Sequence, residues 1–317
     1  MKKLLVIFIL SLYAGCAQNS AEKTASSIDL ALTYLSDDKC SQAIDVLEDA
    51  GYQSGNAIYL QVLASAYSCK AGLNEVAFLT TDLAVLNTTS IETILTSLVT
   101  MSLSDESTVD SDEYSAIKAG INILVGSTSG APSHTARVDK FGPRKAGDMG
   151  VQALILNLIN LGKFLNLYGN VDASGVKGAG ANSPDNSCLM NYTDTRAVTL
   201  ITSPAGAGGS CTVVNGGHPS LDRSTSDGKR LLCEGLVLLT NIFDILDELD
   251  LSASSELNVL EAMSTQIETI RTTATVAGLG ALITQTSQSE CETSMNTSTN
   301  LDDMEYFYSL IYESGLL

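Results

Sequence analysis

Apolar residues recur at helical spacing in the middle of the chain. Two segments carry them three and four positions apart, which places them on one face of a helix. The first comprises Ile91, Ile94, Leu95, Leu98 and Val99, and the second Tyr114, Ile117, Ile121 and Leu124. Thr89 or Ser90 can cap the first helix, because their side-chain oxygens accept hydrogen bonds from the N–H groups of a first turn. Asp110 or Ser111 can open the second in the same way.

Residues 151–168 are apolar on nearly every side of the helix that they predict. Such a helix is buried at the centre of a protein. Membrane insertion is the alternative, and we discount it because four polar side chains interrupt the segment. These are Asn157, Asn160, Lys163 and Asn166. The same periodicity predicts further helices over 227–249, 255–276 and 302–312.

Two stretches rich in Gly, Ser, Asn and Pro interrupt the helical pattern, at 127–147 and 169–226. Structureless loops as long as the second are uncommon in compact domains and tend to be functional or disordered. Cys188 and Cys211 lie inside it, which favours order. We therefore predict an all-α protein with a large disulfide-containing loop insertion in its second half. Its expected parts are helical hairpins over 28–126, a boundary loop over 127–147, and a helical part over 148–317 with the insert at 169–226.

Residues 28–87 contain one pattern twice. The first copy consists of Leu30, Ala31, Tyr34, Ala43, Leu47 and Ala50, and Leu63, Ala64 and Tyr67 repeat its beginning at an offset of 33. The pattern resembles the tetratricopeptide repeat, in which small residues let two antiparallel helices pack closely and an aromatic side chain fills the groove between them. The resemblance implies an array of helical hairpins in this part of the chain.

The hairpin geometry makes a specific prediction about two cysteines. Cys40 lies 14 residues before Ser54, and Cys69 lies 14 residues after Gly55. If the chain turns at Ser54-Gly55, both cysteines lie at the same height on antiparallel helices, so they can reach the Cα separation of ~5.5 Å that a disulfide prefers. Pairing of either with another cysteine is the alternative. The other four are Cys188, Cys211, Cys233 and Cys291, whose connectivity the sequence leaves open.

The N-terminus has the pattern of an export signal. Lys2 and Lys3 precede a nearly continuous apolar run from Leu4 to Leu12, too short to span a bilayer, which needs about 20 apolar residues. The run ends in Leu12-Tyr13-Ala14-Gly15-Cys16, which resembles the lipobox of bacterial lipoproteins.

This resemblance implies a signal peptide over 1–15, cleavage before Cys16 and lipidation of that cysteine. Residues 16–27 are small and polar and are expected to form a flexible tether. Ala17 in place of Asp points to the outer membrane, with the protein facing the periplasm. An ordinary secretory signal, in which Cys16 is incidental, is the alternative.

The net charge of the chain limits the classes of partner that it can bind. It has 17 basic and 36 acidic residues, and loss of Lys2 and Lys3 leaves a net charge of −21. Such a surface repels phosphate backbones and anionic lipid, so nucleic acid is excluded as a partner and membrane attachment is expected to rest on the lipid. The six cysteines beyond Cys16 suggest disulfides in an oxidising compartment. With no C-x-x-C and two His, no metal site or cofactor is predicted, except for a weak calcium pattern at Asn170, Asp172 and Ser174 that lacks the expected Glu.

Two basic clusters lie in the predicted loops. The first is His134, Arg137, Lys140, Arg144 and Lys145, and the second is His218, Arg223, Lys229 and Arg230. If the loops met over the helix at 151–168, these residues would form a pocket for a carboxylate or phosphate. The alternative, which we favour, is that they pair with the protein's own acidic residues.

No convergent catalytic set is visible, so an enzyme is not expected. The hypothesis that we prefer is an envelope lipoprotein whose helical repeats form a periplasm-facing scaffold for protein–protein interaction. Its partner would be another envelope protein or a peptide. The alternative is a lipoprotein that binds a small anionic molecule through the loop-covered second half.

Overall fold

A computed structural model describes residues 20–73, 86–101, 109–125, 134–178, 187–202, 216–247 and 258–315, with single positions at 78, 81, 83, 180, 211 and 249. The described residues form helices and no strand, apart from one isolated bridge between Cys188 and Gly217. The all-α prediction is therefore confirmed. The helices are α2 (Ser20–Ser36), α3 (Cys40–Asp49), α4 (Ala57–Lys70), α7 (Ile91–Thr100), α8 (Asp112–Val125), α9 (His134–Phe141), α10 (Pro143–Tyr168), α11 (Thr195–Thr202), η2 (Pro219–Leu221), α12 (Ser226–Leu246), α13 (Asn258–Val276), α14 (Gln288–Ser294), α15 (Ser298–Phe307) and the π-helical η5 (Tyr308–Glu313).

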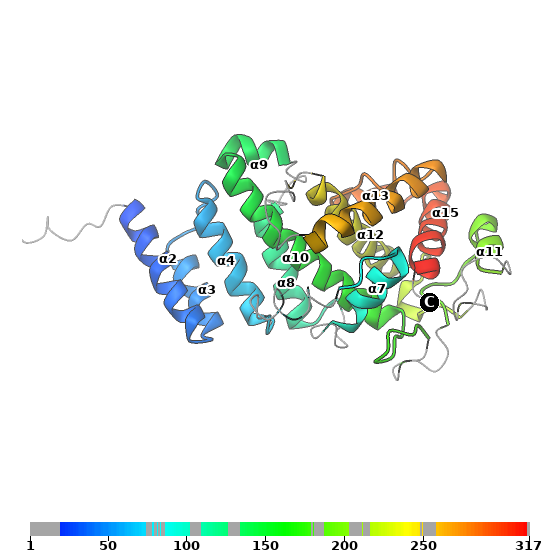
Figure 1. The fold of residues 1–317 in the computed structure, drawn as a ribbon, viewed down its shortest axis with the longest axis horizontal. Helices are drawn as coiled ribbons and strands as arrows, with labels where there is room; N and C mark the ends of the chain where they lie inside the picture. Colours follow the sequence, from blue (N-terminus) through cyan, green and yellow to red (C-terminus); the bar gives the residue numbers. More distant parts are fainter. Residues whose placement is uncertain are drawn as a thin grey trace, which may run out of the picture.

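The molecule is elongated, with α2, α3 and α4 at one end and α11, α13 and α15 at the other (Figure 1). Helix α2 packs on α3 and α4, and α4 packs on α8. Helix α10 lies in the middle and contacts α7, α8 and α12. The chain thus runs from a set of short hairpins into a core organised around one long helix.

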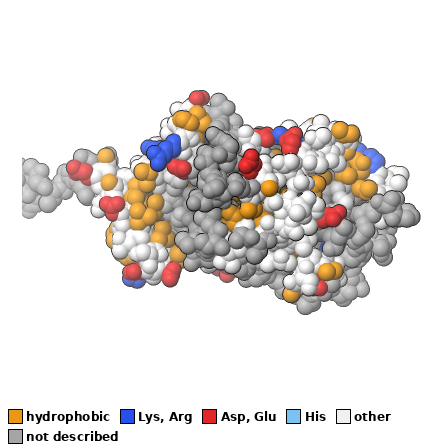
Figure 2. All heavy atoms as spheres, in the orientation of Figure 1, with side chains coloured by type: hydrophobic (Ala, Val, Ile, Leu, Met, Phe, Trp, Pro, Cys, Tyr) orange, Lys and Arg blue, Asp and Glu red, His pale blue; other side chains and the backbone are white. Residues whose placement is uncertain are grey.

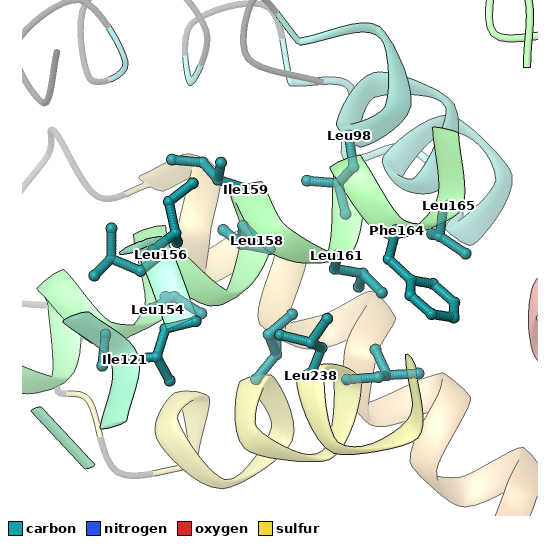
Figure 3. Close-up of a cluster of buried hydrophobic side chains, with 14 of the residues drawn as sticks. Leu98, Ile121, Leu154, Leu156, Leu158, Ile159, Leu161, Phe164, Leu165 and Leu238 are labelled. Atoms are coloured by element: carbon teal, nitrogen blue, oxygen red, sulfur yellow. The ribbon is translucent and has the colours of Figure 1, made fainter. Parts of the chain in front are cut away.

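Helix α10 is the buried central helix that the sequence predicts, and it begins earlier, at Pro143. Proline suits a first helical position because it has no N–H to leave unpaired. Leu154, Leu158 and Leu161 are completely buried, and Figure 3 shows the α10 side chains packed among those of α7, α8 and α12. Among the described residues α10 is also the one helix long and apolar enough to cross a membrane, but 78% of its most apolar stretch is buried inside the protein.

Glycines allow α10 and α12 to pack closely. A Cβ atom on Gly235 of α12 would lie 2.4 Å from Tyr308 Oη and 2.6 Å from Phe164 Cε1. Near the other end of the pair, Gly150 of α10 faces Ile245, whose Cγ2 would lie 3.8 Å from a Cβ atom on the glycine. Because residue 164 faces 235 while 150 faces 245, the two helices run antiparallel.

The predicted Cys40–Cys69 disulfide is confirmed, with a Cα separation of 5.5 Å between the start of α3 and the end of α4. The hairpin argument holds because the turn between these helices is centred where the sequence places it. Two further disulfides join Cys188 to Cys211, within the insert, and Cys233 to Cys291, between α12 and α14.

Three predicted boundaries are wrong in part. The tether expected over 16–27 ends early, because α2 begins at Ser20. The loop expected over 127–147 contains α9 and the first turn of α10, and the insert at 169–226 contains α11 and η2. Small and polar residues misled the sequence argument in each case, since tertiary packing overrides weak local propensity. The signal peptide at 1–15 and Cys16 lie outside the described residues.

Candidate functional site

A groove follows α4 and α8 on the hairpin half of the molecule. It consists of two adjoining hollows of about 450 and 340 Å³, which share Tyr52, Asn122 and Ile123. We call it the tyrosine groove. The first hollow is further lined by Glu48, Tyr59, Leu63, Tyr67 and Ala119. The second is lined by Ser54, Leu60, Leu124, Ala136, Arg137, Lys140, Phe141 and Met149.

Hydrogen bonds fix two of its tyrosines. Tyr59 is buried and donates its hydroxyl to the Leu47 carbonyl oxygen at 3.0 Å, while Tyr67 donates to Glu48 Oε1 at 2.8 Å. Burial, and then the bond to Glu48, raise the pKa of Tyr67 to about 12. Tyr52 is 60% exposed and meets the Tyr59 ring edge-on at 6.2 Å between centroids. The groove therefore has a rigid aromatic floor and one aromatic ring accessible to a partner.

One end of the tyrosine groove is cationic. Arg137 and Lys140, both on α9, line the smaller hollow, whose lining includes no Asp or Glu. Arg137 is only 4% exposed, and Lys140 is exposed with its ammonium 5.2 Å from the centroid of Phe141. In a chain of net charge −19, a hollow with two basic residues and no acidic one favours an anionic group.

The rest of the first predicted cluster lies outside this hollow. Arg144 and Lys145 are exposed in the first turn of α10 and do not line it. The backbone of His134 opens α9, and its side chain lies outside the described residues. The sequence thus identified Arg137 and Lys140 as candidates, but it could not separate them from their exposed neighbours.

The second predicted cluster is engaged by the protein itself. Arg223 pairs with Asp302 at 2.7 Å and with Glu305 at 2.8 Å, and Arg230 pairs with Asp110 at 3.2 Å. This is the alternative that we favoured from the sequence. Lys229 is half-buried in the first turn of α12.

His218 is also held internally, since its Nδ1 accepts a hydrogen bond from the Ser220 N–H at 3.1 Å. Its ring lies edge-on to Tyr168, with 4.9 Å between centroids. Burial lowers its pKa, so this ring is an uncharged acceptor over more of the neutral range.

The two basic clusters do not meet over α10. His218 contacts Tyr168 at the C-terminal end of this helix, whereas Arg144 lies in its first turn. A helix of 26 residues separates its ends by about 39 Å. The pocket that would have formed if the loops met over this helix is therefore not present among the described residues.

Buried acidic residues, which the sequence analysis missed, fasten the insert to the C-terminus. Glu313 pairs with Lys177, both fully buried, and accepts hydrogen bonds from the Leu189 N–H at 2.6 Å and the Tyr192 hydroxyl at 2.7 Å. Glu305 likewise accepts from the N–H groups of Thr193 and Asp194. Every contact joins the insert to α15 or η5, so the insert is a fixed part of the core. Lys177 and Glu313 are 136 positions apart in the chain, so no local sequence pattern indicates that they pair.

In the segment with the calcium pattern, the loop's own backbone N–H groups bind the side-chain oxygen of Asp172. Asp172 Oδ1 accepts hydrogen bonds from the N–H groups of Ser174 and Val176 at 2.8 and 2.9 Å. Asn170 takes a positive φ of 46°, as a turn residue. Alternating oxygen side chains here form a turn in which aspartate satisfies nearby N–H groups.

A set of metal-type ligands, Cys188, Cys211 and Glu313, has ligand atoms within 4.8 Å of one another. The two sulfur atoms are bonded to each other, so neither is a thiolate. A wide hollow of about 650 Å³ between α12 and α13 contains Arg271, which is paired with Asp247 and Glu268. Of the described hollows, only the tyrosine groove combines exposed aromatic surface with basic residues that line it.

A scan against protein-family models and searches of curated proteins and of solved structures gave no match for this chain.

Proposed function

We propose that this protein is a bacterial envelope lipoprotein that acts as a periplasm-facing scaffold. In this proposal Cys16 carries the lipid, and the hairpins from α2 onward are tetratricopeptide-like. The tyrosine groove binds a segment of another envelope protein. The lipobox pattern supports the anchor, and three disulfides suit an oxidising compartment.

The tyrosine groove carries the proposal. Tyrosine supplies a large apolar area together with a polar end, and few rotatable bonds are lost when it binds. Tyr52 offers such a ring at 60% exposure, beside Asn122 and Ile123 in the lining of the groove. Arg137 and Lys140 add a preference for a segment that carries a carboxylate at that end.

Site-specific photo-crosslinking tests the groove. A benzoylphenylalanine residue is placed at Tyr52 in cells, and a matched one is placed at Val276, which is 84% exposed at the end of α13. We expect a discrete adduct from position 52 only. Lys140→Glu should weaken it, whereas Lys145→Glu, with the same charge change outside the groove, should not. The same adducts from both positions, or none from position 52, would contradict a partner in this groove.

The anchor has its own test. Cys16→Ser should leave the precursor uncut and displace the protein from the membrane fraction. Normal maturation of that variant would exclude lipidation at Cys16.

A further inference from the structure

A second groove lies at the α2 end of the molecule, with a volume of about 560 Å³. Its apolar lining comes from α2 and from the start of α4. The residues are Ala21, Ala25, Ile28, Leu32 and Ile58. Leu32 is 48% exposed and Ile58 is 50% exposed, and Figure 2 shows hydrophobic side chains gathered over the α2–α4 end. We call this the end groove.

The end groove lies along the border between the buried and the exposed sides of α2. Its four apolar α2 residues follow one another at intervals of four, three and four positions, which aligns them along one side of the helix. The stripe from Ala21 to Leu32 is roughly 17 Å long at a helical rise of 1.5 Å per residue. Ala31, which packs toward the protein core, is fully buried. Ile28 is only 8% exposed and belongs to the same core, whereas Ala21, Ala25 and Leu32 are exposed, so the stripe is the solvent-exposed border of the core-facing side of α2.

The end groove is close in the chain to the proposed lipid anchor, because α2 begins shortly after Cys16. Helix α2 begins at Ser20, four residues after Cys16. Four residues of extended chain span at most ~14 Å. A lipid on Cys16 would hold the end groove within that distance of the bilayer, and a short linker makes even a weak contact effective because the local concentration is high.

We propose that the end groove docks on the bilayer that carries the anchor, so that the molecule stands on its α2 end. This inference rests on the lipid anchor of the proposed function. Leu32 and Ile58 insert among the acyl chains at the interface, while Asp29 and Asn56 at the rim of the groove stay among the headgroups. Glu22 and Asp29 are exposed here, so the surface suits a zwitterionic lipid better than an anionic one.

Docking in this way would place the tyrosine groove close to the membrane. The turn between α3 and α4 separates the two grooves, since Gln53 and Asn56 line the end groove while Tyr52 and Ser54 line the tyrosine groove. A partner segment would then be held just above the headgroups.

Tryptophan fluorescence tests the contact, because the chain has no tryptophan of its own. Leu32→Trp and Val276→Trp each introduce one reporter at an exposed apolar position, the first on α2 and the second at the end of α13. The lipidated proteins are reconstituted in phosphatidylcholine vesicles, with and without phosphatidylcholine brominated on its acyl chains. We expect a blue shift and several-fold stronger bromine quenching at position 32 than at 276. Ile58→Asp in the Leu32→Trp protein should remove most of that quenching.

Each other outcome excludes something definite. Vesicle-bound protein with equal quenching at both positions, or with none at position 32, would overturn the docking while leaving the anchor intact. A blue shift at position 32 without vesicles, with a dimer in sedimentation, would assign the end groove to a second copy of the chain. Failure of the mature protein to bind vesicles at all would contradict the anchor itself.

Discussion

The hairpin half and the insert-bearing half of this molecule stabilise themselves by different means. In the first, helices α2, α3 and α4 pack together with buried alanines among them, and one disulfide joins α3 to α4. In the second, one disulfide closes the insert on itself and another joins α12 to α14, while the buried Glu305 and Glu313 bind the insert to α15 and η5. The end groove and the larger hollow of the tyrosine groove lie in the first half.

The comparison reverses a common expectation about loops. A long irregular segment is often where function lies. Here the insert is fastened by Glu305 and Glu313, and the cations around it are paired internally. The regular hairpins, which leave Tyr52, Leu32 and Ile58 exposed, offer the better binding surfaces. Exposed side chains, rather than loop character, indicate where a partner can bind.

Breaking the buried ion pair should have the largest effect. Glu313→Gln leaves the Lys177 ammonium buried without its counter-charge, which costs about 3–5 kcal/mol of unfolding free energy for a fully buried pair. Thermal and urea denaturation measure the loss. Asp37→Asn, which breaks the exposed pair with Lys39, should change stability by less than ~1 kcal/mol. Similar losses of unfolding free energy in both variants would show that the buried pair does not stabilise the fold more than an exposed one.

Removing the Cys40–Cys69 disulfide should affect the other half. Replacing both cysteines by alanine should lower the unfolding free energy by about 3–4 kcal/mol, because the 29-residue loop is no longer closed in the unfolded chain. Limited proteolysis locates the change. Cleavage within 28–73 should be faster in the variant than in wild-type protein. An unchanged cleavage pattern would mean that the hairpins do not depend on this bond.

Gly235→Ala should test the close packing at the centre of the second half. The new methyl group would meet Phe164 and Tyr308, so the helices must move apart, at a cost of roughly 1–3 kcal/mol. Gly147→Ala is the matched control, because a Cβ atom there meets nothing within 4 Å. Equal melting temperatures for the two variants would contradict this account of the contact between α10 and α12.

The smallest expected effect concerns Tyr67 and pH. Its pKa of about 12 lies above the value of the unfolded chain, about 10, so the protonated form stabilises the fold. That contribution is complete below pH 10 and is lost as the pH rises through 12. Tyr67→Phe should therefore lose less stability than wild type between pH 10 and 12, by a margin that solvent exposure keeps small. Urea denaturation across this range measures it, and parallel curves would exclude the contribution.

Local rules predicted much of the hairpin half. The spacing of Ile91 to Val99 and its cap at Ser90 gave a helix close to α7, and Ser90 does form a capping box with Thr93. Counting outward from one turn gave the Cys40–Cys69 pairing. These arguments work because helix periodicity and hairpin symmetry relate residues that are near one another in the chain.

Those local rules could not predict contacts between segments that are distant in the chain. By itself, the sequence determined the all-helical class, the buried α10 and one disulfide. Only the tertiary structure decided that Lys177 meets Glu313, that the basic clusters lie at opposite ends of α10, and that Arg137 and Lys140 line a groove while Arg144 and Lys145 do not. A charged residue looks the same in sequence whether it faces water, a counter-charge or a hollow. The packing of elements more than a hundred residues apart makes that choice, because burial and pairing depend on what the folded chain brings beside it.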